Sequence, residues 1–123
     1  MGKQRNPLIA GMKIYIAGPY TRGDVAVNVR NAIEAGNALF EEGACPFIPH
    51  LTHFWHMLCP QDYHRWLIYD NQWLGCCDML LRLEGESTGA DEEVATAIAL
   101  NIPVYYDIRE LLLCTPDAPP KWT

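Results

Sequence analysis

The chain has 123 residues, of which 50% are hydrophobic and 20% are charged, and its formal net charge is −6. This length supports one domain with a single core, and the composition excludes a disordered chain. Because phosphate backbones require clustered positive charge and the sequence has no Lys/Arg-rich run, we expect no polymeric nucleic acid as a partner. No apolar stretch approaches the 18 residues of a membrane span, so we expect no membrane partner.

The start of the chain and its cysteines indicate a cytoplasmic protein. The first residues, "MGKQRNPLIAGMK", contain no apolar run long enough for a secretion signal. The cysteines are odd in number and two are adjacent, which is typical of reduced thiols. They are Cys45, Cys59, Cys76, Cys77 and Cys114. We expect residues 12–113 to form the domain, with tails at 1–11 and 114–123.

Short β-rich runs alternate along the chain with segments of helical spacing. The pattern predicts strands at 13–17, 45–49, 78–83 and 102–106, and helices at 28–43, 60–75, 91–101 and 108–113. This alternation implies right-handed crossovers and a parallel sheet with helices on both faces. We therefore predict a small doubly wound α/β domain, flavodoxin-like or Rossmann-like, with a sheet of four to five strands.

Two loops at the carboxyl ends of the predicted strands are rich in small and hydroxyl residues. "GPYTRGD" (18–24) follows the first strand and "EGESTG" (84–89) follows the third. Ligands of open parallel sheets bind beyond the carboxyl ends of the strands, near the switch in strand order. We expect the site to lie between these two loops.

Two adjacent glutamates of the predicted helix 91–101 point in different directions. On a wheel of about 100° per residue, Glu93 lies about 40° from Ala97 at the edge of the apolar face, whereas Glu92 points into solvent. We expect Glu93 in the first helical turn, where the helix dipole favours the ionised carboxylate by roughly 0.3–1 kcal/mol. An ionised carboxylate in a crevice suits a nucleophile, and a simple complement to the dipole is the alternative.

Asp70 lies in the middle of the apolar stripe of the predicted helix 60–75. The stripe comprises Tyr63, Trp66, Leu67, Trp73 and Leu74. Burying an unpaired carboxylate costs several kcal/mol, so such a residue needs a partner or a task. The structural alternative is a cap or a salt bridge to Arg82 or Arg22. The functional alternative is a pair of acids of the kind that cleaves glycosidic bonds.

Four segments carry a family resemblance through their order and spacing. They are "IYIAGPYT" (14–21), "DNQWLGCCD" (70–78), "STGADEE" (87–93) and "EVATA" (93–97). Together they resemble the nucleoside 2-deoxyribosyltransferase-like superfamily, including the 2'-deoxynucleoside 5'-monophosphate N-glycosidases, over roughly residues 12–107. The resemblance implies a small nucleoside or nucleotide substrate, no cofactor and a homo-oligomer, either a dimer or a tetramer.

The resemblance also implies a role for each matching residue. Glu93 would attack C1' of the sugar to form a glycosyl-enzyme, Asp70 would position the sugar or handle protons, and Tyr15 would hold the Glu93 carboxylate. Water as the acceptor gives a hydrolase and a nucleobase gives a transferase. The substrate would be bound by Gly18, Tyr20, Thr21, Arg22, Ser87 and Gly89. The alternative is a nucleotide-binding or sensing protein without turnover.

Three histidines recur every three residues in "PHLTHFWHMLCP" (49–60). They are His50, His53 and His56. On a helix the outer two would be about 120° apart, which is too splayed for one metal ion, so we expect no metal. We expect either a loop that packs its aromatic residues over the core or one that contacts a nucleobase through Trp55 or Phe54.

Overall fold

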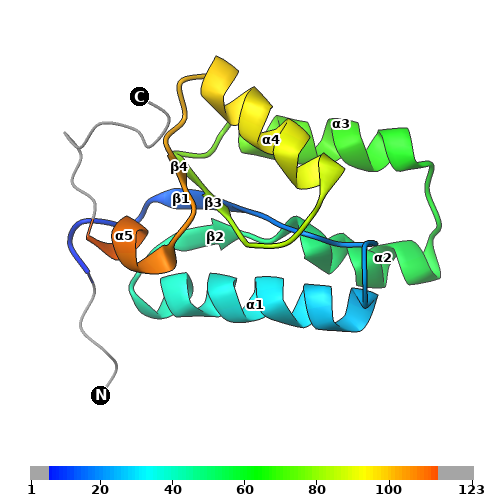
Figure 1. Ribbon diagram of the computed structural model, residues 1–123, viewed down its shortest axis with the longest axis horizontal. Helices are drawn as coiled ribbons and strands as arrows, with labels where there is room; N and C mark the ends of the chain where they lie inside the picture. Colours follow the sequence, from blue (N-terminus) through cyan, green and yellow to red (C-terminus); the bar gives the residue numbers. More distant parts are fainter. Residues whose placement is uncertain (1–5, 114–123) are drawn as a thin grey trace.

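Four short parallel strands in the order β2-β1-β3-β4 form the centre of the computed structural model, which describes residues 6–113 (Figure 1). They are β1 (Lys13–Ala17), β2 (Cys45–Phe47), β3 (Met79–Arg82) and β4 (Val104–Tyr105). In the register of the sheet, Tyr15 is level with Phe47 on one side and Leu80 on the other. The chain crosses from β2 over β1 to β3, so the strand order reverses between β1 and β3. The predicted doubly wound α/β fold is confirmed.

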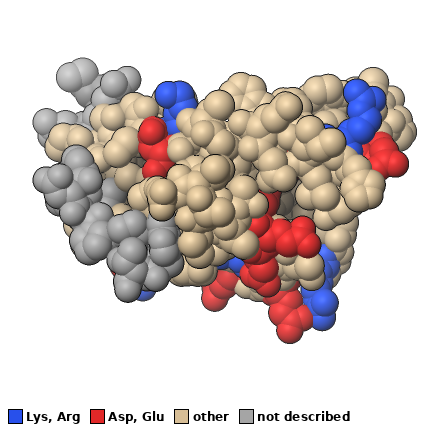
Figure 2. Space-filling model, turned by 90° about the horizontal axis from the view of Figure 1, so that it is seen from above, with Lys and Arg blue, Asp and Glu red and all other residues tan. Residues whose placement is uncertain are grey.

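Helices cover both faces of this sheet. On one face lie α1 (Val25–Glu41) and α5 (Ile108–Leu112), and on the other lie α3 (Tyr63–Leu74) and α4 (Thr88–Ala99) (Figure 1). Figure 2 looks onto the molecule from the side of α3 and α4, and it shows acidic side chains gathered beside a hollow. No helix within residues 6–113 combines the length and the apolarity that a bilayer crossing needs.

The side chains of β1 alternate between two hydrophobic cores. Ile14 and Ile16 pack in the cluster beneath α1 and α5, and Tyr15 and Ala17 pack in the cluster beneath α4. All four are fully buried, as expected for a strand covered on both faces. The alternation directs the Tyr15 side chain toward α4.

Part of the segment expected as an N-terminal tail packs onto the domain. Ile9 is fully buried in the α1 core. The Asn6 side chain donates to the Leu112 carbonyl (2.8 Å), and its backbone N–H donates to the Glu42 carbonyl (2.9 Å). This segment has no periodic pattern, so its packing leaves no sequence signal. The tail expected at 114–123, including the fifth cysteine, lies outside the described residues.

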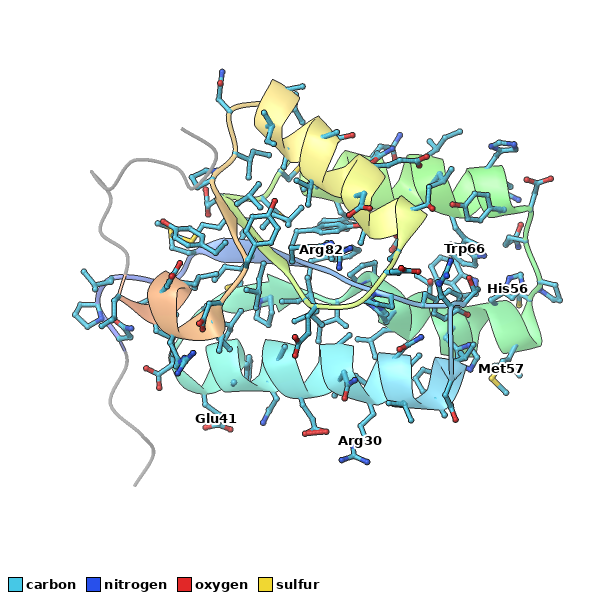
Figure 3. The ribbon with its side chains drawn as sticks, viewed as in Figure 1. Arg30, Glu41, His56, Met57, Trp66 and Arg82 are labelled. Carbon is cyan, nitrogen blue, oxygen red and sulfur yellow. The ribbon has the colours of Figure 1, made fainter. Side chains whose placement is uncertain are left out.

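The histidine segment is helical, whereas we expected a loop. Pro49 opens a short 3-10 helix, η1 (Pro49–Leu51), and α2 (Thr52–Leu58) follows directly. No residue of α2 is buried, and Met57 points away from the domain (Figure 3). A seven-residue helix without a buried face has no apolar periodicity, which explains why the sequence pattern did not indicate it.

Candidate active site

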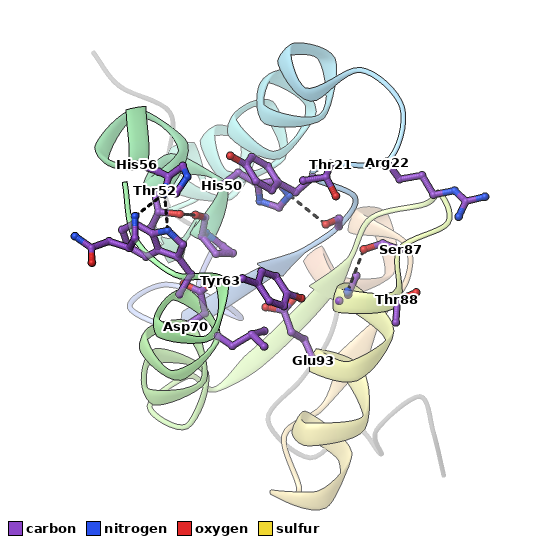
Figure 4. A pocket seen from close by; sticks show the side chains of 18 residues that line it. Thr21, Arg22, His50, Thr52, His56, Tyr63, Asp70, Ser87, Thr88 and Glu93 are labelled. Atoms are coloured by element: carbon purple, nitrogen blue, oxygen red, sulfur yellow. Dashed lines mark hydrogen bonds between the residues drawn. The ribbon is translucent and has the colours of Figure 1, made fainter. Parts of the chain in front are cut away.

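A cavity of about 850 Å³ lies between α3, α4 and the loops at the carboxyl ends of β1 and β3 (Figure 4). Its size is typical of a small-molecule site. Both expected acids, Glu93 and Asp70, contribute to its wall. The expected substrate-binding residues in the wall are Gly18, Tyr20, Thr21, Arg22, Ser87 and Gly89.

Trp55, which we expected at the site, does not line this cavity. Its ring packs edge-on against Trp66 and Tyr69, with centroid distances of 5.1 and 5.6 Å, and it is 48% exposed. Phe54 is 52% exposed and is also absent from the wall. Trp55 packs against α3 and Phe54 is exposed, so a nucleobase contact by either residue stays a prediction. The cavity presents Trp66 of α3 in their place.

Glu93 reaches the cavity from the second turn of α4. We expected the helix to begin at Asp91, but its first residue is Thr88, because the Ser87 side chain caps it by accepting from the Ala90 N–H (3.1 Å). The carboxylate is therefore beyond the turn in which the helix dipole acts most strongly. The wheel argument itself is confirmed, since Glu92 is exposed and Glu93 is partly buried.

Tyr15 holds the Glu93 carboxyl group. The phenol is fully buried beneath α4 and donates its O–H to Glu93 Oε2. Burial, followed by the negative charges of Glu93 and Asp70, raises the pKa of Tyr15 far above its ordinary value. The phenol therefore stays protonated and acts as a fixed donor.

Both acids have raised pKa values. Burial raises the pKa of Glu93 to about 7, although the Tyr15 hydrogen bond and the charge of Arg82 oppose the rise. Burial, followed by the charge of Glu93, raises the pKa of Asp70 to about 7. The expectation of a carboxylate kept ionised by the helix dipole was therefore wrong. Near neutral pH the two groups hold roughly one proton between them.

No arginine neutralises Asp70 in the described part of the chain. Arg82 bonds to Asp91 (2.9 Å), and Arg22 pairs with Glu86 (2.6 Å), so both expected salt-bridge partners are engaged elsewhere. Within residues 6–113, Asp70 Oδ1 is buried and has no hydrogen-bond partner. A buried acceptor without a partner on a cavity wall is positioned to meet a ligand.

The first loop approaches the third strand closely at Gly18. A Cβ at this position would come within 3.1 Å of the Leu83 side chain, so only glycine fits without displacement. The ring of His50 secures the loop, because its Nε2 lies 3.2 Å from the Gly18 carbonyl and 3.0 Å from the Pro19 carbonyl. Since carbonyls only accept, that nitrogen carries the proton.

The histidines organise the cavity wall. His53 Nδ1 lies 2.8 Å from the Tyr20 hydroxyl, and His56 Nδ1 accepts from the Trp66 indole at 3.0 Å. Burial lowers the pKa of His50. No three His, Cys, Asp or Glu side chains within residues 6–113 converge as metal ligands would. Sequence reasoning missed these contacts because each joins segments that are distant or irregular.

The comparisons with known proteins bear on the family and the fold. Residues 12–107 match a family described as a domain of unknown function, DUF7768. No curated protein matches the chain. One similar solved structure is a 2-deoxyribosyltransferase from the psychrotolerant bacterium Bacillus psychrosaccharolyticus. It has 20% identity and a TM-score of 0.55, and the match covers 75% of this chain and 69% of that one. This likeness shows a shared fold, and the family match shows that the chain belongs to the DUF7768 family.

Proposed function

We propose that the protein cleaves or transfers at the N-glycosidic bond of a nucleoside or a nucleoside 5'-monophosphate, with Glu93 as the nucleophile. The observation that carries the proposal is that Glu93 and Asp70 share one cavity at the carboxyl edge of the sheet. The shared fold with a 2-deoxyribosyltransferase supports the same chemistry, as do the four matching sequence segments. On this basis we also propose membership of the nucleoside 2-deoxyribosyltransferase-like superfamily.

The first step joins Glu93 to the sugar. Its ionised carboxylate attacks C1' as the C1'–N bond breaks, and the bonding electrons leave with the nucleobase. Tyr15 holds Oε2, which leaves Oε1 as the attacking atom. The negative charge beside the oxocarbenium-like transition state stabilises it. The product is a covalent glycosyl-enzyme.

Asp70 handles the proton in this scheme. With a pKa raised to about 7, it is protonated in a large fraction of molecules at neutral pH and can donate to the departing base. In the second step the ionised Asp70 accepts a proton from water, whose oxygen bonds to C1' and releases Glu93. A second nucleobase in place of water gives transfer. The shared proton thus matches the needs of both steps.

We further propose that the protein is a homo-oligomer in the cytoplasm. Large apolar side chains on η1, α2 and α3 are exposed, namely Leu51 (46%), Phe54 (52%), Met57 (65%), Leu58 (85%) and Ile68 (61%). Association of copies would cover such side chains. Free, exposed thiols at Cys45, Cys59 and Cys76 suit a reducing compartment. Light scattering on active preparations tests the homo-oligomer, and a purely monomeric active protein would contradict it.

The central experiment compares two adjacent glutamates. Purified protein is incubated with deoxyribonucleosides, ribonucleosides and their 5'-monophosphates, with and without a second free base, and the products are resolved by chromatography. Glu93→Gln should abolish base release, whereas the matched control Glu92→Gln, altered on the exposed side of α4, should leave it nearly unchanged. An equal loss in both variants contradicts Glu93 as the nucleophile. Tight binding without base release by the unaltered protein would favour the sensing alternative.

A further inference from the structure

The cavity has two chemically different ends, with Glu93 and Asp70 between them. Ser87 and Thr88 at the start of α4 lie on one side, and His56 and Thr52 of α2 lie on the other (Figure 4). Under the proposed function, on which this inference rests, the reacting C1' must lie at Glu93. The N-terminal end of α4, with its positive helix dipole, suits the polar 5' end of the sugar. The nucleobase then extends toward α2 and α3.

The ring of His56 is fixed at this second end by two donors. The Gln61 backbone N–H (3.1 Å) and the Trp66 indole N–H (3.0 Å) both donate to its Nδ1. A nitrogen that accepts hydrogen bonds carries no proton, so the ring proton lies on Nε2. Trp66 packs edge-on against the ring, with centroids 6.0 Å apart, and the two side chains lie close together in Figure 3. His56, which lines the cavity, therefore carries its N–H donor on Nε2 in a fixed tautomer.

A second donor lies beside it. The Gln61 side chain accepts from Arg65 Nη1 through Oε1 (2.6 Å), which leaves its amide N–H groups to donate. Gln61 and His56 both line the cavity, next to the indole of Trp66 and the side chain of Leu67. This end thus combines apolar walls for a planar ring with N–H donors for its edge.

We propose that His56 selects nucleobases that present a carbonyl oxygen at this edge, namely 6-oxopurines and 4-oxopyrimidines, over the corresponding amino bases. A carbonyl accepts from His56 Nε2–H. An exocyclic amino group would place N–H against N–H and leave donors unpaired. Such mismatches typically reduce binding roughly tenfold to a hundredfold. Trp66 acts as a positioning residue, because its indole fixes the tautomer of the ring.

Matched substrate pairs test this selection. The specificity constant for base release is measured for deoxyinosine against deoxyadenosine and for deoxyuridine against deoxycytidine. We expect the oxo base to be preferred at least about tenfold in each pair. His56→Phe keeps an aromatic ring but removes the donor, so the ratio should fall toward one through loss on the oxo substrates. Trp66→Phe should lower the ratio partially, and the control His64→Phe, altered on the exposed side of α3, should preserve it.

The outcomes separate this inference from the proposed function. Preference for amino bases, or an oxo preference that survives His56→Phe, overturns the inference alone. Absence of base release from every substrate overturns the proposed function and the inference with it. If circular dichroism shows that His56→Phe is unfolded, the wild-type ratios and the Trp66→Phe ratio decide. A ratio unchanged in a folded Trp66→Phe variant then counts against the proposal.

Discussion

Replacing Asp70 with asparagine should stabilise the protein in alkaline solution and have little effect in acid. Asparagine has nearly the same shape as aspartate but cannot ionise. Burial raises the pKa of Asp70 from an ordinary 3.8 to about 7 in the folded protein. Between these values the folded state holds the proton more tightly than the unfolded state, so the stability of the wild type falls as the pH rises through this window. Above pH 7 the wild type carries the full loss of stability that ionising the buried Asp70 causes.

The size of this penalty follows from the pKa shift. A shift of about three units at 1.36 kcal/mol per unit gives about 4 kcal/mol. Since the side chain is only partly buried, solvent screening reduces our expectation to about 2 kcal/mol. For a domain of this size, that corresponds to a rise in melting temperature of roughly 6–10 °C in Asp70→Asn at pH 8.5.

Thermal unfolding followed by circular dichroism from pH 4 to pH 9 measures the effect. The control is Glu41→Gln, which alters an exposed acid on α1 far from the cavity. The difference between Asp70→Asn and wild type should grow with pH, whereas the control should follow the wild type at every pH. A difference that is the same at pH 4.5 and pH 8.5 would refute the reasoning, because it would show that Asp70 titrates alike in both states.

Three further predictions concern activity. The rate of base release should peak near pH 7, since Glu93 must be ionised and Asp70 protonated, and Asp70→Asn should remove the alkaline decline in the pH profile. Tyr15→Phe should lower the turnover number roughly tenfold to a hundredfold. It should also move the acidic limb of the pH profile to higher pH, because the Tyr15 hydrogen bond lowers the pKa of Glu93 and its removal raises that pKa. Glu86→Gln should release Arg22 and increase the use of 5'-monophosphates relative to nucleosides, most strongly at low salt.

The fold could be predicted from the sequence because its signals are local. Each strand is a short β-rich run, and α1 shows apolar residues at helical spacing. The start of α4 was misplaced because Thr88 and Gly89 resemble a turn, and glycine is a poor helix former. The cap at Ser87 outweighs this local preference. Short-range propensity therefore located the strands and the longer helices but not η1 and α2, while side-chain capping determined where α4 begins.

The ionisation of the site could be predicted only in part. The helical wheel places Glu93 at the edge of the apolar face, and the stripe argument identifies Asp70 as unusual. The raised pKa of each acid depends on burial by α3, α4 and β1 together. The spacing of residues within a single helix or strand contains no information about such burial. The contacts of His56 were equally hidden, because its partners Gln61 and Trp66 lie beyond an irregular connection.

A structural role does not account for the acid pair. A salt bridge would lower the pKa values of Glu93 and Asp70, whereas burial raises both, so each group opposes folding at neutral pH. Tyr15 offsets part of the cost for Glu93 with one hydrogen bond, but the buried oxygen of Asp70 has no partner within residues 6–113. We therefore expect two amides in the same positions to give a domain that is more stable at neutral pH. Under the proposed function, the acids supply a nucleophile and an exchangeable proton, which amides cannot, and both acids line a cavity whose size is typical of a small-molecule site.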